Sequence, residues 1–200
     1  VIDLTLGELN ITSGVWIFGT GARRLTIQRS FVPGTSDFRI FRVATTGTGV
    51  QIRRLSIRNG NAGSQDGGGI LVEANSALSL TDVAVTSNSA AKGGGIANAG
   101  RHFSVKRVLF NSNSAAANGG GIFNQVTFLP LSGPEVSNST ITNNTAARGG
   151  AIYNNGSIFL ANNTISQNNA TVAATGIFSE SGSINVLNTI IGRDGSSSAS

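Results

Sequence analysis

A glycine-rich phrase recurs along this chain at a nearly constant spacing. Three glycines followed by isoleucine occur at residues 67–70, 93–96 and 119–122, and looser versions of the phrase end at Ile152 and Ile177. The five isoleucines are 26, 26, 30 and 25 residues apart. A period of this size indicates a repeat architecture, in which each unit stacks on the next because a single unit cannot bury its own apolar face.

A second pattern lies between the glycine-rich phrases. Each occurrence is eight residues long, with apolar residues at positions 1, 3 and 8 and mostly polar residues at positions 4 and 5. It occurs at residues 50–57, 78–85, 103–110, 134–141, 158–165 and 184–191. Alternation with a period of two indicates a strand with one buried face. Together with the Gly-Ile strand, each unit therefore contains three short strands and three turns, which is one coil of a parallel β-helix.

Stacking the units places apolar residues in three inward columns. The first column is Val50, Leu78, Phe103, Pro134, Ile158 and Ile184. The second column is Ile52, Leu80, Val105, Val136, Leu160 and Val186. The third column is Ile57, Val85, Phe110, Ile141, Ile165 and Ile191. Pro134 alone is unusual for a strand. We predict an all-β fold, a right-handed parallel β-helix of about seven coils, with the hand taken from the general preference for right-handed crossovers.

The glycines and asparagines have structural explanations in this frame. Glycine runs permit left-handed backbone and close packing between coils, and a phosphate-binding loop would need a helix after the glycines where this chain has a strand. Three residues after the third inward column come Gly60, Asn88, Asn113, Asn144, Asn168 and Asp194. We expect Asn88, Asn113, Asn144 and Asn168 to stack as a ladder in which each amide binds the next.

The predicted corner between the second and third strands carries charged residues. Its column reads Arg24, Arg54, Asp82, Arg107, Asn138, Asn162 and Asn188. In this register Asp82 lies between Arg54 and Arg107, about 4.8 Å from each along the axis. We predict corner ion pairs among these three residues, and because the corner is exposed, these pairs stabilise the fold only slightly.

The net charge of +5 comes entirely from residues 1–58, where eight arginines face Asp3, Glu8 and Asp37. Two interpretations remain open: a solvated basic surface, or an anion-binding patch. The candidate residues of such a patch are Arg23, Arg39, Arg42 and Arg53. Its partner would be an anionic polysaccharide or another surface glycan. A nucleic-acid site would need aromatic residues between the basic ones, and we interpret Trp16, Phe38 and Phe41 as core residues.

The sequence predicts no catalytic, metal or cofactor site. Glycoside hydrolysis needs two carboxylates about 5–9.5 Å apart, and calcium-dependent lyases need several oxygen ligands. None of the nine acidic residues stacks on another at the coil period, and His102 has no acidic neighbour in register. The chain contains no cysteine, and no apolar run approaches the roughly 20 residues of a membrane span.

Some of the repeated motifs resemble those of a known family. Residues 149–152, Gly-Gly-Ala-Ile, and residues 110–113, Phe-Asn-Ser-Asn, resemble the GGAI and FxxN repeats of polymorphic outer membrane proteins. The alternation of GGGI with "STITNNTA" is also similar to bacterial right-handed β-helix repeat proteins that carry a variable C-terminal surface anchor. The resemblance covers about residues 1–192 and implies a pectate-lyase-like scaffold in a secreted or surface-displayed bacterial protein.

Four functions are considered. The first is a non-catalytic surface module for adhesion or a structural role, which we favour. The second is a polysaccharide-active enzyme whose site lies outside our register. The third is an ice-binding solenoid, which needs an outward threonine array; the column Thr26, Ser56, Ala84, Leu109, Thr140, Thr164 and Ile190 is too mixed. The fourth is a filament subunit that associates end to end through unpaired strand edges.

The domain organisation follows from the repeats. We predict one β-helix domain over residues 1–194, with residues 1–17 acting as an N-terminal cap. Residues 195–200 are rich in serine and are expected to be a flexible tail or the start of a linker.

Overall fold

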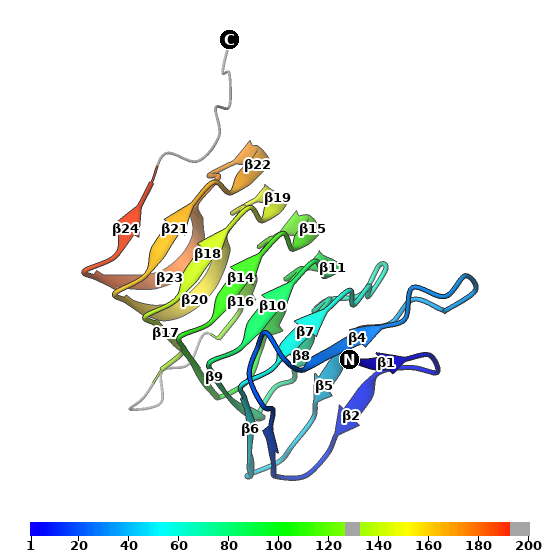
Figure 1. The fold of residues 1–200 in the computed structure, drawn as a ribbon. Coiled ribbons are helices and arrows are strands. Elements are labelled where there is room, and N and C mark those ends of the chain that lie inside the picture. The colour runs from blue at the N-terminus through cyan, green and yellow to red at the C-terminus, as the bar shows by residue number, and fades with distance from the viewer. Residues whose placement is uncertain (127–132, 193–200) are drawn as a thin grey trace.

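The computed structural model describes residues 1–126 and 133–192, and the strands in these residues stack into a parallel β-solenoid of about seven coils (Figure 1). The described residues contain strands and turns but no helix, so none of them forms a helix long and apolar enough to cross a membrane. All the pairings between neighbouring coils are parallel, as in Phe41–Val43 beside Ile70–Val72. The predicted fold class is confirmed, while the right-handed sense stays a prediction from crossover preference.

Three ladders of strands run the length of the solenoid. The first ladder comprises β2 (Leu9–Ile11), β5 (Phe41–Val43), β8 (Ile70–Val72), β12 (Ile96–Asn98), β16 (Ile122–Asn124) and the beginnings of β20 (Ile152–Ala161) and β23 (Ile177–Leu187). The second comprises β3 (Val15–Phe18), β6 (Gly49–Arg53), β9 (Ala77–Thr81), β13 (His102–Lys106), β17 (Glu135–Ser137) and the ends of β20 and β23. The third comprises β1 (Ile2–Leu4), β4 (Thr26–Arg29), β7 (Ser56–Arg58), β10 (Ala84–Thr86), β14 (Leu109–Asn111), β18 (Thr140–Thr142), β21 (Thr164–Ser166) and β24 (Ile190–Ile191).

The structure adds a fourth, shorter ladder between the third and the first. It comprises β11 (Ser89–Lys92), β15 (Ser114–Asn118), β19 (Thr145–Arg148) and β22 (Asn169–Ala173). One alanine of each strand is buried, and the pairing shifts register within the strands. Small residues without bulky alternation give no strand signal, so sequence patterning did not predict this ladder.

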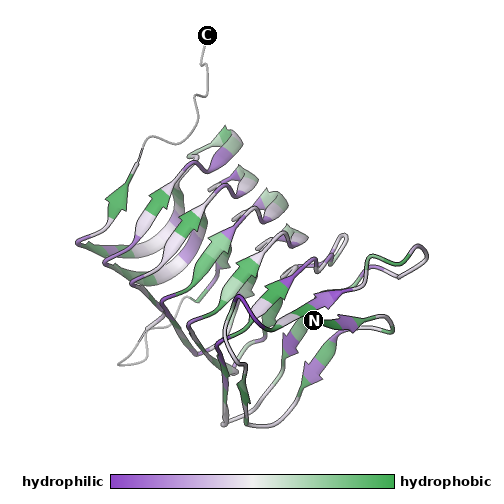
Figure 2. Ribbon diagram, viewed as in Figure 1, coloured by the Kyte–Doolittle hydropathy of each residue, from purple (hydrophilic) through white to green (hydrophobic). Residues whose placement is uncertain are grey.

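The predicted inward columns are confirmed by the pairing register. Leu78 lies beside Val50 and Phe103, and Ile158 lies beside Ile184. Pro134, the unusual member, is buried, and its carbonyl oxygen accepts a hydrogen bond from the Phe159 amide. Most residues of these columns form one continuous apolar core, visible as green bands on the stacked strands in Figure 2. In the last coil Val186 and Ile191 are 48% and 51% exposed.

A further inward column follows directly after the corner residues, and the sequence analysis did not predict it. Arg54, Asp82 and Arg107 have φ values of +57°, +57° and +54°, in the left-handed region. This turn points the next residue inward, and Leu55, Val83 and Val108 are buried in the core. Each corner therefore consists of one left-handed residue whose own side chain projects outward.

The glycine runs fit together coil upon coil. The first glycine of each run is left-handed, with φ of +73° at Gly67 and +62° at Gly93. At the second position there is no space, because a Cβ on Gly94 would lie 2.3 Å from the Ser114 carbonyl oxygen. The Gly94 amide donates to the Gly119 carbonyl at 3.2 Å, so the backbones of neighbouring coils contact directly.

The predicted asparagine ladder is present and buried. Asn88, Asn113, Asn144 and Asn168 are at most 1% exposed, and each Oδ1 of the last three accepts from the Nδ2 of the asparagine one coil earlier at 2.9–3.0 Å. Each Nδ2 also donates to a third-ladder carbonyl, as Asn113 does to Val85 at 2.9 Å. Asp194, which would continue this column, lies outside the described residues.

A second asparagine ladder stands at the end of the first strand ladder. The Nδ2 of Asn98 donates to Asn124 at 2.9 Å, and that of Asn124 donates to Asn154 at 2.8 Å. The triplets at residues 96–98, 122–124 and 152–154 all end in asparagine, and this repetition could have predicted the second ladder.

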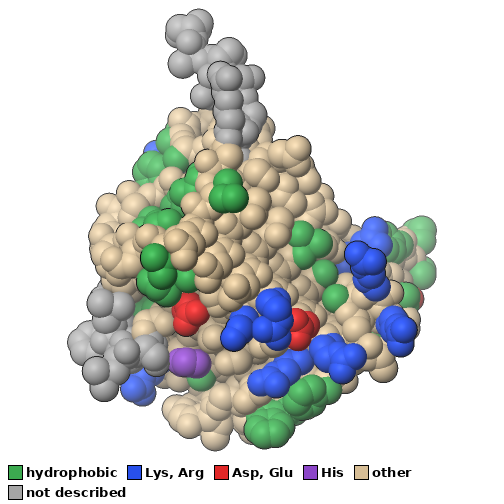
Figure 3. Space-filling model, turned by 60° about the vertical axis from the view of Figure 1, so that its left-hand side comes forward, with side chains coloured by type: hydrophobic (Ala, Val, Ile, Leu, Met, Phe, Trp, Pro, Cys, Tyr) green, Lys and Arg blue, Asp and Glu red, His purple; other side chains and the backbone are tan. Residues whose placement is uncertain are grey.

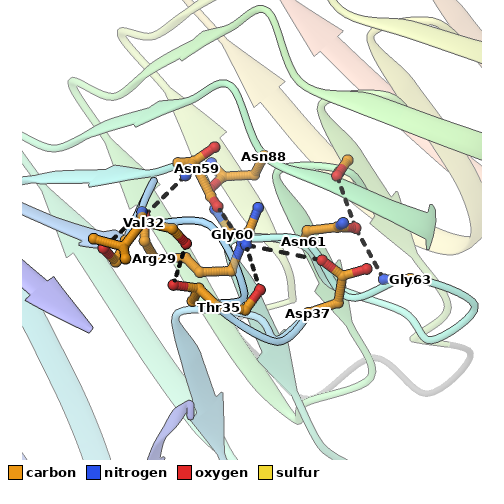
Figure 4. Close-up of polar contacts among 11 residues, drawn as sticks. Arg29, Val32, Thr35, Asp37, Asn59, Gly60, Asn61, Gly63 and Asn88 are labelled. Carbon is orange, nitrogen blue, oxygen red and sulfur yellow. Dashed lines mark hydrogen bonds and ion pairs between the residues drawn. The ribbon is translucent and has the colours of Figure 1, made fainter. Parts of the chain in front are cut away.

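Arg29 holds the long loop that follows β4 (Figure 4). Its guanidinium donates to the Thr35 and Asn59 carbonyls at 3.3 and 3.2 Å and lies 3.9 Å from the Asp37 carboxylate. Asn59 donates back to the Arg29 carbonyl at 2.8 Å. This arginine therefore has a structural role, although it belongs to the basic first third of the chain.

Residues 1–17, predicted to be an N-terminal cap, form the first coil and extend the three ladders. β1 pairs with β4, β2 with β5 and β3 with β6, and no described strand pairs with the other edge of β1, β2 or β3. End-to-end association through such edges stays a prediction.

The glycine contact predicts a large effect of one added methyl group. Gly94→Ala should lower the free energy of unfolding by about 1–3 kcal/mol, because the Ser114 backbone must move away from the new Cβ. The control is Gly49→Ala at the start of β6, where an added Cβ meets nothing within 4 Å. Urea unfolding of both variants measures the difference, and equal stability would contradict the close packing.

The asparagine ladder predicts a comparable loss. Asn113→Ala should destabilise the fold by about 2–4 kcal/mol, because Asn88 and the Val85 carbonyl lose buried partners. Asn185→Ala, at an exposed position of β23, should change the unfolding midpoint little. A small effect at Asn113 would show that this ladder does not stabilise the fold.

Candidate anion-binding site

Arg54, Asp82 and Arg107 occupy the same corner position in successive coils. They connect β6 to β7, β9 to β10, and β13 to β14. Their left-handed backbone projects each side chain away from the core. The stack therefore forms a charged line that runs along the solenoid axis.

Asp82 is held by Arg107 in a two-point contact. The Arg107 Nε donates to Asp82 Oδ1 at 2.6 Å, and Nη2 donates to Oδ2 at 3.0 Å. The two side chains are 43% and 48% exposed. The hydrogen bond from Arg107 lowers the pKa of Asp82, and the charges of Arg107, Arg54 and Arg53 lower it further, while partial burial opposes them. Asp82 therefore stays ionised and keeps Arg107 in place.

A groove opens beside this corner and gathers more arginines than acids. It encloses about 600 Å³ and is lined by Arg23, Arg24, Arg54, Asp82 and Arg107. Ala22, Val83, Ala84 and Leu109 supply its apolar walls. We call the five charged residues the arginine corner; its formal charge is +3. Figure 3 shows Lys and Arg side chains gathered on this part of the surface around an acidic side chain.

Two exposed aromatic residues lie next to the arginine corner. Trp16 and Phe18, both on β3, are 67% and 56% exposed, and their rings meet edge to face at 6.2 Å and 76°. The interpretation of Trp16 as a core residue is wrong, because Trp16 pairs in register with outward-facing Gln51. Phe41, by contrast, is fully buried in the core. The guanidinium of Arg53 lies over the Phe18 ring at 5.7 Å.

The structure does not bring the four predicted arginines together. Arg39 is only 5% exposed; it pairs with Glu8 at 2.8 Å and donates to Gln65 at 2.6 Å. Its inclusion in an anion-binding patch is therefore wrong, because its charge is neutralised inside the fold. Arg42 donates to Glu73 at 2.7 Å, a contact that raises the pKa of Arg42. Of the four, Arg23 lines the groove and Arg53 lies beside Phe18.

Within the part of the chain that the structure describes, the other ionisable groups form no comparable site. Burial, and then the hydrogen bond to Glu180, raise the pKa of Tyr153 to about 12, so its hydroxyl stays protonated. Tyr153 stacks between Phe123 and Phe178 at 5.5 and 5.2 Å. Among residues 1–126 and 133–192, no group of three or more His, Cys, Asp or Glu residues could hold a metal ion.

The comparison with known families matches the repeat. Residues 107–125 and 138–155 are similar to the Chlamydia polymorphic membrane protein repeat. This chain is a β-helix repeat protein that resembles the polymorphic outer membrane proteins. No curated protein and no solved structure matches it. The matched segments contain Asn113, Asn144 and two of the glycine runs, so the similarity describes the scaffold, and Arg107 is the one member of the arginine corner within it.

The lowered pKa of Asp82 predicts how the ion pair depends on pH. A carboxylate whose pKa falls on folding stabilises the protein above its unfolded pKa of about 3.9 and loses that effect as pH falls through the folded value. Asp82→Asn should therefore be slightly less stable than the parent near pH 7, and this difference in stability should be smaller near pH 3 than near pH 7. Urea unfolding at both pH values tests this, and a difference that grows in acid would contradict it.

Proposed function

We propose that this chain is a non-catalytic β-helix module displayed on a bacterial cell surface, where it adheres to an anionic polymer through the arginine corner. The repeat match to polymorphic membrane proteins supports a surface or outer-membrane role. The rigid stacking of the coils suits a module that presents one face to its surroundings.

The observation that carries this proposal is that three arginines of the groove form no ion pair with any residue in the described part of the chain. Asp82 is engaged by Arg107 on two points, while Arg23, Arg24 and Arg54 line the same groove. Arginine forks bind carboxylate, sulfate and phosphate groups on two points. A line of such forks along the axis fits an extended polyanion better than a single small anion.

Removal of two arginines from the corner should weaken this binding. Arg24→Ser/Arg54→Ser should reduce affinity for an anionic polysaccharide such as heparin at least about tenfold at low salt, because two charge-assisted contacts are lost. Parent binding should also weaken steeply as salt rises. Isothermal titration calorimetry at two salt concentrations measures both effects.

The matched control removes the same net charge elsewhere. Arg101 and Arg148 are exposed, and neither lines the groove, so Arg101→Ser/Arg148→Ser should bind nearly as well as the parent. Asp82→Asn should bind more tightly, because it releases Arg107 and removes the negative charge from the groove. Equal losses in the two double variants, or no binding by the parent at low salt, would overturn the proposal.

A further inference from the structure

We infer that Trp16, with Phe18, Gln51 and Arg53 around it, is a sugar-stacking subsite, and that the polymer bound at the arginine corner is an acidic polysaccharide. This inference rests on the proposed function of the corner. The positive charge of the corner does not distinguish among polyanions, since heparin, polyphosphate and nucleic acids all offer regularly spaced anions. The aromatic subsite selects the polysaccharides among them.

The first observation is the position of Trp16. It stands on the outward face of β3, in register with Gln51, Ser79 and Ser104 on the next three coils. An exposed indole offers a flat apolar face, and a sugar ring has one apolar C–H face with hydroxyls around its edge. The amide and hydroxyl side chains that follow Trp16 are suited to bind those hydroxyls.

The second observation is Arg53, which connects this subsite to the corner. Its guanidinium covers Phe18, and its charge contributes to the lowered pKa of Asp82. Its Nε is buried and has no hydrogen-bond partner among the described residues. Because this atom is closed to solvent, a bound polymer would reach it only if the Arg53 side chain turned outward. Such a turn would relieve the cost of a buried donor without a partner.

The spacing of the coils matches a polysaccharide. Neighbouring coils are about 4.8 Å apart, which is comparable to the length of one hexose unit. A chain lying along the axis would place one sugar on Trp16 and the next ones over Gln51 and Ser79. Its acidic groups would then face Arg53 and the arginine corner.

A single-stranded nucleic acid fits the same surface less well. Successive bases stack on successive aromatic faces, but the Trp16 and Phe18 rings stand at 76° to one another. The next outward residues are Gln51, Ser79 and Ser104, which offer no ring. One stacking face followed by neutral polar side chains favours sugars.

The experiment uses Trp16 as its own reporter, because it is the sole tryptophan in the chain. Polygalacturonate, a polysaccharide with one carboxylate per sugar, should shift or quench the tryptophan emission. Inorganic polyphosphate and oligothymidine, used as non-saccharide polyanions, should bind at the corner and leave the emission nearly unchanged. Trp16→Ala should weaken polygalacturonate binding about tenfold, and polyphosphate binding less than twofold, by calorimetry.

Phe159→Ala is the matched control, since Phe159 continues the outward column of Trp16 at the far end of the solenoid and is also exposed. It should bind polygalacturonate like the parent. If polyanion binding needs Arg24 and Arg54 while Trp16→Ala behaves like the parent, or if oligothymidine changes the emission equally, the sugar subsite is refuted and the corner stands. If no polyanion binds in an arginine-dependent way, the proposed function fails and takes this inference with it.

Discussion

Direct backbone contact between neighbouring coils is the constraint on which the rest of this structure depends. The Gly94 and Ile96 amides donate to the Gly119 and Gly121 carbonyls at 3.2 and 3.0 Å, and the same contact is repeated along the stack. A Cβ at the second glycine of a run would lie 2.3–2.4 Å from a backbone carbonyl oxygen of the next coil, so a side chain there would push the coils apart. The glycine runs therefore set the coil spacing, and the buried asparagine ladders fix the turns at that spacing.

This constraint divides the chain into two kinds of position. Most inward residues belong to apolar columns or are asparagines whose amide groups bind the next coil, so they are committed to the fold. Outward positions also stack in register from coil to coil, but their side chains can differ. At the left-handed corner the side chain points away from the core. One line of the surface can therefore carry Arg54, Asp82 and Arg107, while the same line in later coils carries Asn138 and Asn162.

Much of the fold could be predicted, because the coil-length repeat and the alternation of apolar and polar residues identify the inward columns directly. The fourth ladder could not, because the Ser-Ala segments around Ala90 and Ala115 lack bulky alternation. The corner residues were predicted as one column, but formal charge does not distinguish a buried arginine such as Arg39 from an exposed one. Trp16 was assigned to the wrong face, because it lies in the first coil, where the apolar-polar alternation of Val15, Trp16, Ile17 and Phe18 is absent.

The register of the outward faces is the central claim, and a disulfide tests it directly in a chain that has no cysteine of its own. Ser79 and Ser104 are opposite one another on β9 and β13, about 4.8 Å apart, within the Cα range of a disulfide. The variant Ser79→Cys/Ser104→Cys should form an intramolecular disulfide on mild oxidation. Ser79→Cys/Lys106→Cys, two residues out of register and about 8 Å apart, should not. Cross-linking of the second pair and not the first would contradict the register and every outward column that depends on it.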